Sequence, residues 1–213
     1  MMRRIKILRQ LLIISIVVCL GIYQTIYSSA YVTCGYKMTG SWQDENYYVV
    51  NRSVTYNGIT IDFGSLADSA VTLWNTVDSS SGHNLDIALT ETTNGSSVST
   101  RVSIGALDRG NTGWAGFTYY IGYNTITHEH FNINYGGYPN QNYHAGSAVI
   151  NLYYVQNYPG WKIKNVIMHE MGHAFGLKHS DVSGALMAAN VVSYTYLKMP
   201  QNDDINGVRS IYE

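Results

Sequence analysis

The sequence predicts an α+β fold in which two long helices and a short C-terminal helix pack on a twisted, mixed β-sheet. Three observations support this prediction. Apolar side chains recur at helical spacing in residues 65–77 and 161–175. Between these segments lie β-like runs separated by short loops rich in Gly, Asn and Ser. A short amphipathic segment from Asp203 closes the chain. Strands followed by strands, with few helices between them, are typical of this fold class.

The first 30 residues are typical of a secretory signal peptide. An apolar run at 11–22 follows four basic residues, and small residues at 28–30 follow the run; the basic residues are Arg3, Arg4, Lys6 and Arg9. The run is shorter than the roughly 20 residues that span a bilayer. We therefore expect export to the extracellular space, with one domain at 31–213. The alternative is an uncleaved N-terminal anchor, and only then would the protein associate with a membrane.

The remaining chain is mildly acidic. Removing four of the 13 basic residues leaves nine against 14 acidic residues, a formal charge of −5. This balance offers no electrostatic footprint for nucleic acid. Loss of Cys19 with the signal segment leaves Cys34 alone, so no intramolecular disulfide is expected. Nothing in the sequence indicates a nucleotide or flavin cofactor.

The first elements are a β-rich segment and a helix. Residues 47–61 read as strands around an Asn57-Gly58 turn, which is a strong hairpin signal. The helix is expected at 65–77, with Ser65 and Asp68 resembling a capping box. Its apolar positions are expected in the core: Leu66, Ala70, Leu73, Trp74 and Val77.

Candidate strands follow at 85–89, 102–107, 115–121, 125–135 and 148–155. The second helix is expected at 161–175, with Ile163, Val166, Ile167 and Ala174 facing the core. The third begins near Asp203, where acidic side chains favour the positive end of the helix dipole, and its apolar side carries Ile205, Val208 and Ile211.

The most informative stretch is HEMGHAFGLKH, residues 169–179. His169 and His173 are four residues apart on a helix and therefore lie on one face. Gly176 can end the helix in the left-handed conformation, so that His179 returns as a third ligand. Three imidazoles with one open position are typical of a catalytic zinc site. The alternatives are a chance arrangement on a solvated helix and a metal site without activity.

This run resembles the zinc site of the metzincin metallopeptidases, and hence predicts a metzincin (zincin-like) fold. Ser180, the run Ala185-Leu186-Met187 and the tail at 201–213 resemble the matrixin branch. The compact layout fits a bacterial origin.

The resemblance implies one catalytic Zn²⁺ bound by the three histidines, whose water would have a pKa near 7. It implies Glu170 as the general base and then the general acid, and Met187 as an apolar floor beneath the histidines. Asp203 and Asp204 would tie the last helix to the loop that carries Met187.

The sequence departs from the matrixin pattern in two places that concern the active site. We expect no prodomain, because the segment between residue 30 and the first strand is too short for one, and of the usual switch motif only the pair Cys34-Gly35 is present. A miniature switch is one hypothesis for Cys34, and a free or intermolecular thiol is the other. After Met187 the usual Pro and Tyr are missing, which leaves Tyr194 and Tyr196 as candidates to line the specificity pocket.

Further ligand and substrate positions are hypotheses. His128 and His130 share one face of the 125–135 strand, opposite Phe131, Ile133 and Tyr135 on the core face. With His144 they could bind a second Zn²⁺, although a solvated strand face is the ordinary interpretation. Asp108 and Asn111 could similarly lie near Ca²⁺. Residues 113–117, with Trp114, are the candidate edge strand along which a peptide substrate lies.

Two functions follow. The first is a secreted zinc-dependent endopeptidase that hydrolyses peptide bonds in extended protein segments. The second is a secreted, zinc-stabilised binding or adhesion module without turnover. Glu170 favours the first, because zinc binding alone would not need it.

Overall fold

The computed structural model describes residues 31–39, 45–80, 87–96, 99–134 and 137–213. Its sheet has six strands in the order β4-β1-β5-β8-β6-β7. Their bounds are β1 Asn46–Val49, β4 Thr90–Glu91, β5 Thr100–Leu107, β6 Gly116–Asn124, β7 Glu129–Asn134 and β8 Ala145–Asn151. The pairs β4–β1, β1–β5 and β5–β8 are parallel, whereas β8–β6 and β6–β7 are antiparallel. The predicted mixed sheet of an α+β fold is therefore confirmed.

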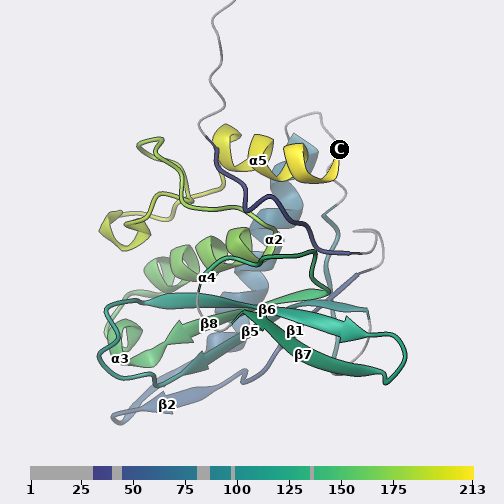
Figure 1. Cartoon of the computed structure of the whole chain (residues 1–213). Coiled ribbons are helices and arrows are strands. Elements are labelled where there is room, and N and C mark those ends of the chain that lie inside the picture. The colour runs from purple at the N-terminus through teal and green to yellow at the C-terminus, as the bar shows by residue number, and fades with distance from the viewer. Residues whose placement is uncertain (1–30, 40–44, 81–86, 97–98, 135–136) are drawn as a thin grey trace, which may run out of the picture.

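Two long helices, α2 (Phe63–Ser80) and α4 (Gly160–Ala174), lie on the same side of the sheet, and α5 (Asn202–Tyr212) lies beyond α4, farther from the sheet (Figure 1). Trp74 of α2 is fully buried between the helices: its indole N–H donates to the Met168 carbonyl at 3.0 Å, and its ring meets Phe175 edge-on at 5.1 Å. The core is thus built between α2, α4 and the sheet. None of the described helices is both long and apolar enough to cross a membrane.

The predicted hairpin is confirmed as β2 (Val54–Tyr56) and β3 (Ile59–Ile61). Asn57 and Gly58 both have positive φ, 49° and 79°, as a tight hairpin turn of this kind requires. The predicted capping box at the start of α2 is wrong. Asp62 caps the helix by accepting from the Ser65 N–H at 3.2 Å, whereas Asp68 accepts from the Tyr47 hydroxyl at 3.0 Å.

Two predicted strands have different bounds. Residues 85–86 lie outside the described residues, and Ile87 and Leu89 are buried without forming a strand before β4. The strand predicted at 148–155 ends at Asn151, because the Asn151 side chain accepts from the Tyr153 N–H and caps the short helix α3 (Leu152–Val155). The predicted second and third helices are confirmed as α4 and α5, with a capping box between Gln201 and Asp204.

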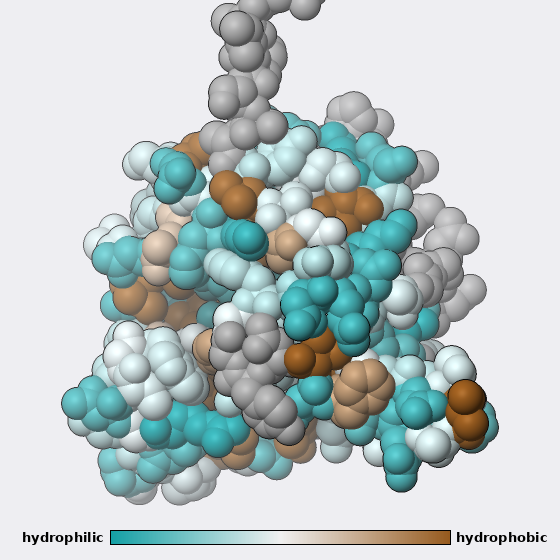
Figure 2. Space-filling view, in the orientation of Figure 1, coloured by the Kyte–Doolittle hydropathy of each residue, from teal (hydrophilic) through white to brown (hydrophobic). Residues whose placement is uncertain are grey.

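The strand predicted at 125–135 is β7, preceded by a turn, and its predicted core face is wrong in part. Phe131 is 47% exposed, because it covers the backbone of Gly122 on β6 instead of entering the core. Ile133 is partly buried against the core, and Tyr135 lies outside the described residues. Figure 2 shows that apolar surface on the side in view is divided into separate patches among polar residues.

Candidate metal centre and catalytic cleft

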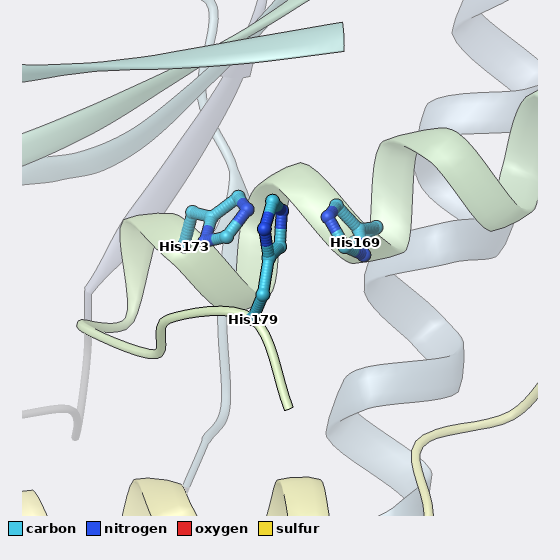
Figure 3. Close-up of side chains that lie close together, drawn as sticks. All are labelled: His169, His173 and His179. Carbon is cyan, nitrogen blue, oxygen red and sulfur yellow. The ribbon is translucent and has the colours of Figure 1, made fainter. Parts of the chain in front are cut away.

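Three histidines converge at the C-terminal end of α4. His169 and His173 project from the helix, and His179 returns from the loop that follows it (Figure 3). Their ring centroids are 4.7, 4.9 and 5.2 Å apart. One nitrogen from each ring lies within 4.8 Å of the others, which is close enough for one shared metal ion. The structure therefore brings together the three residues that the spacing predicted.

The loop that carries His179 is set by the helix end. Gly176 has φ of 98°, its N–H donates to the His173 carbonyl at 2.8 Å, and the Leu177 N–H donates to the Gly172 carbonyl at 3.0 Å. These two bonds form a Schellman motif, which reverses the chain at a glycine. The local sequence thus explains why a residue six positions after His173 returns to the same site.

Hydrogen bonds fix two of the rings. The Nδ1 of His169 lies 2.8 Å from the Leu186 carbonyl, and the Nδ1 of His173 lies 2.8 Å from the Leu177 carbonyl. A carbonyl only accepts, so Nδ1 carries the proton in each ring and Nε2 keeps its lone pair. Metal-binding histidines are commonly oriented in this way.

Burial keeps these imidazoles neutral. It lowers the pKa of His169 well below its usual value and that of His173 to about 4, and repulsion from the neighbouring imidazoles acts in the same direction. Burial also lowers the pKa of the more exposed His179. Neutral imidazole is the form that binds a metal, so the site is prepared for a cation at neutral pH.

Met187 packs against the backbone of α4 at Gly172. A side chain at Gly172 would lie 2.3 Å from the Met187 sulfur, so the glycine is what allows this contact. Asp204 accepts from the Met187 and Leu186 N–H groups, both at 2.9 Å. The Ser180 hydroxyl donates to Asp203 at 2.6 Å. The expected connection of the last helix to the Met187 loop is confirmed.

Glu170 is 4% exposed, and its carboxylate faces β6. The Thr118 hydroxyl lies 2.8 Å from both Oε2 and the carbonyl oxygen of Glu170. A side chain at Gly116 would lie 2.6 Å from Oε1, so β6 approaches the carboxylate closely only because residue 116 is glycine. Burial raises the pKa of Glu170 to about 8, against the opposing effect of the Thr118 hydrogen bond.

A cavity of about 270 Å³ joins Glu170 to His173 and His179. Its walls come from β6, the loop before it, the segment after β7, α4 and the loop after α4. The lining residues are Trp114, Gly116, Phe117, Thr118, Tyr120, Gly137, Tyr138, Glu170, His173 and His179. The cavity is mainly apolar and aromatic away from the acid and the imidazoles. Such a concave, mostly apolar site with a few convergent polar groups is typical of a catalytic cleft.

Sequence reasoning missed Tyr138. Its ring lies edge-on to His173 at 5.8 Å, and its hydroxyl accepts from the His179 N–H at 3.3 Å. Tyr138 is 35 residues from His173 in the sequence, and no periodic pattern connects the two. Thr118 and Gly116 were missed as partners of Glu170 for the same reason.

The predicted specificity residues Tyr194 and Tyr196 do not line this cavity. The Tyr194 hydroxyl donates to the Ala185 carbonyl at 2.8 Å, and Tyr196 is 56% exposed. Behind them Asn165 of α4 donates to the Tyr196 carbonyl and accepts from the Lys198 N–H. Their role in contacting substrate stays a prediction.

The predicted arrangement of a second metal site differs from the structure. His128 lies in the turn before β7 with φ of 58° and bonds to the Tyr123 hydroxyl, so it does not share a strand face with His130. The His130 and His144 rings are 5.3 Å apart, and Arg101 lies 2.7 Å from His144. Within the described ranges, the group at 169, 173 and 179 is the one set of three or more His, Cys, Asp or Glu close enough for a metal.

The two side chains considered for calcium, Asp108 and Asn111, accept hydrogen bonds from nearby groups of the protein. Asp108 accepts from the Gly110 N–H at 2.8 Å, and Asn111 accepts from the Tyr154 hydroxyl. A calcium site there stays a prediction.

Cys34 does not belong to the group of side chains that could share a metal ion. Its thiol is buried and lies 3.0 Å from the Tyr36 carbonyl, and its N–H donates to the Gly176 carbonyl. Burial raises the pKa of this thiol, which disfavours the thiolate that a metal would bind. The structure therefore does not support the miniature cysteine switch.

Comparison with known proteins agrees with this geometry. The family model described as Matrixin matches residues 74–213. Human matrix metalloproteinase-27 is 50% identical over 54 residues, which are 25% of this chain and 10% of that protein. The 72 kDa type IV collagenase of Gallus gallus is 44% identical over 54 residues (25% and 8%), and the interstitial collagenase of Sus scrofa is 39% identical over 59 residues (28% and 12%).

The matches therefore span about a tenth of the length of these relatives. All three come from animals, and none supports the expected bacterial origin.

Proposed function

Because this chain belongs to the matrixin family, we propose that it is a zinc-dependent endopeptidase that hydrolyses extended segments of protein. One observation carries the proposal: the buried carboxylate of Glu170 shares the walls of a single cavity beside β6 with His173 and His179, and the neutral imidazole of His169 completes their group. A structural zinc site would need neither the open cavity nor Glu170.

The donor set fits zinc. His169, His173 and His179 would supply three nitrogen ligands, and the protons on Nδ1 of the first two leave Nε2 free to bind. Zinc at this position would supply a Lewis acid for the substrate carbonyl and lower the pKa of its bound water to about 7. The loop that carries Met187 supports the ligands from below, because its carbonyl at Leu186 holds the His169 ring.

Glu170 is the proposed general base. Its carboxylate is held by Thr118, so that it accepts a proton from the attacking water and then returns it to the leaving amine. Its raised pKa favours the return of that proton in a dry site, and a bound cation would favour the ionised form needed at the start. Glutamine at this position could not accept the proton.

The peptide itself would lie along the outer edge of β6. Backbone groups at such an edge bind any extended peptide, and the aromatic walls of the cavity, including Trp114, would contact its side chains. We propose further that residues 1–30 direct export and that 31–213 form the catalytic domain, on the basis of the basic, apolar and small-residue order of that segment. The protein would then act in the extracellular space.

The test is proteolysis by the protein recovered from the medium of expressing cells. A quenched peptide library should be cleaved, cleavage should stop with a chelator and return with zinc, and Glu170→Gln should lower the rate at least about 10²-fold. The matched control is Glu129→Gln, which changes an exposed carboxylate on β7. Undiminished cleavage by Glu170→Gln would refute the mechanism. Stoichiometric zinc without any turnover would instead favour the binding or adhesion module.

A further inference from the structure

Strand β7 covers only part of the outer edge of β6. It pairs with residues 120–124 of β6, from Tyr120 opposite Asn134 to Asn124 opposite Glu129. Within the described part of the chain, no strand pairs with the outer edge of β6 at residues 116–119. In Figure 1 the β6–β7 hairpin extends from the sheet as its outermost part. The edge that is open to a peptide is therefore short.

The directions of the backbone N–H and C=O groups of β6 show how short this open edge is. Ala115 and Ile121 accept hydrogen bonds from Asn151 and His144, at 2.9 and 2.7 Å, on the side toward β8. Backbone groups alternate along an antiparallel strand, so the residues at 116, 118 and 120 face the other way. Tyr120 is already opposite Asn134 of β7. Gly116 and Thr118 are thus the two outward-facing residues that remain before β7.

The reacting carbonyl must lie near Gly116. Glu170 Oε1 occupies the space where a side chain at Gly116 would be, so the proposed base is beside this residue. Thr118 is two residues further along the same strand, toward β7. Tyr138, from the segment after β7, lines the same cavity and contacts His173 and His179. The pairing of β7 from Tyr120 onward therefore ends the open edge within a few residues of the proposed base.

We propose that β7 ends the peptide-binding edge at Thr118, so that the substrate pairs through about three residues on the N-terminal side of the cleaved bond. The pairing is antiparallel, which is the more stable arrangement per residue and places the N-terminal side of the peptide toward β7. A fourth residue has no free backbone group to meet on β6. This inference rests on the proposed peptidase function. The preferred substrates would then be peptides cleaved close to their N-terminus, or protein segments whose chain turns away from β6 about three residues before the cleaved bond.

The test is a length series. Starting from a good cleavage sequence, peptides are extended one residue at a time on the N-terminal side and, separately, on the C-terminal side. For the wild type, kcat/KM should rise about two- to tenfold per residue up to the third N-terminal residue, as expected for an added hydrogen-bonded pair, and change less than about twofold after it. A continued rise at the fourth and fifth N-terminal residues, or a limit on the C-terminal side instead, overturns the inference.

A variant pair locates the cause in β7. Phe131→Pro removes a backbone N–H donor and the aromatic side chain from β7 and should weaken its pairing with β6. The control Ile126→Ser changes an 87% exposed side chain in the turn, outside the paired residues. Phe131→Pro should extend the rise to the fourth N-terminal residue by at least about twofold, and Ile126→Ser should keep the wild-type profile. If Phe131→Pro keeps the limit while its circular dichroism confirms a folded protein, β7 is not the boundary.

The outcomes separate this inference from the proposed function. If no peptide of any length is cleaved by zinc-loaded protein, the peptidase proposal itself fails. If peptides are cleaved with Glu170 dependence but without a limit after three N-terminal residues, the peptidase proposal stands and the boundary set by β7 is wrong.

Discussion

The Thr118 hydroxyl lies 2.8 Å from Glu170 Oε2, so a strand that is 52 residues away in the sequence orients the carboxylate of the metal-binding helix. The same hydroxyl lies 2.8 Å from the Glu170 carbonyl and so connects β6 to the backbone of α4. Helix α4 places Glu170 beside the cavity, and the hydrogen bond from Thr118 on β6 orients its carboxylate.

Thr118→Val should weaken catalysis without removing the metal. The variant keeps the shape of the side chain but loses the hydrogen bond that favours the ionised carboxylate, so the pKa of Glu170 should rise further. We expect kcat/KM to fall about tenfold and the acidic limb of its pH profile to move to higher pH. Thr118→Ser should restore both. An unshifted limb in the valine variant would mean that Thr118 does not position the base.

Gly116→Ala tests the close approach of β6 to the base. The added methyl group would lie 2.6 Å from Glu170 Oε1, 2.7 Å from Cγ and 2.9 Å from Cδ, so it must displace the Glu170 side chain. We expect kcat to fall at least about tenfold while the zinc content measured by mass spectrometry stays at that of the wild type. Gly110→Ala is the control for backbone strain, because Gly110 has positive φ and open space around it. Equal losses in both variants would contradict a specific clash.

Asp204→Ala should destabilise the protein and loosen the metal site. The buried carboxylate accepts from the N–H groups of Leu186, Met187 and Gln201, and without it these donors are left unsatisfied. We expect the free energy of unfolding in urea to fall by about 2–4 kcal/mol and zinc affinity to fall with it. Asp181→Ala, at an exposed carboxylate, is the matched control. Wild-type stability in the Asp204 variant would exclude this role.

Glu170→Gln should make the metal-free protein more stable at high pH. In the native state the pKa of Glu170 is raised to about 8 from an ordinary 4.5, so between these pH values the folded protein binds a proton that the unfolded chain has lost. Stability contributed by this group therefore falls as pH rises from 4.5 to 8. Glutamine removes that loss, and the gain over wild type should grow to on the order of 3 kcal/mol at pH 8.

The histidines act in the opposite direction. Their lowered pKa values make the metal-free protein less stable as pH falls below 6.5 toward about 4, because the unfolded chain then binds more protons. The wild type and Glu170→Gln both contain these histidines, so their effect on the free energy of unfolding cancels in the comparison. Urea unfolding in chelator at pH 5 and pH 8 measures the difference, and an equal stability gain at both pH values would contradict the raised pKa.

Zinc should stabilise the wild type through the same histidines. A ligand that binds only the native state adds about 2.7 kcal/mol when its free concentration is 100 times its Kd. We expect the melting temperature to rise on zinc addition and to fall with a chelator. His173→Ala should reduce the rise strongly, and His130→Ala, at an exposed ring on β7, should leave it unchanged. A similar loss in His130→Ala would indicate that a second site contributes.

The sequence alone determined the helices and the convergence of the three histidines, because both depend on local spacing. Helical periodicity predicted α2 and α4 to within three residues at each end, and the spacing of His169, His173, Gly176 and His179 predicted a turn that the Schellman bonds confirm. Each of these features is decided by neighbours along the chain.

Only the tertiary structure decided what surrounds the three histidines. Thr118, Gly116 and Tyr138 reach Glu170 and the histidines through strand order and sheet register, which join residues far apart in the sequence. The alternation in 129–134 could not show that Phe131 covers Gly122 on β6, because a strand pattern separates two faces without telling which one meets the core. The length of the open edge beside the base follows from that same pairing of β7 with β6.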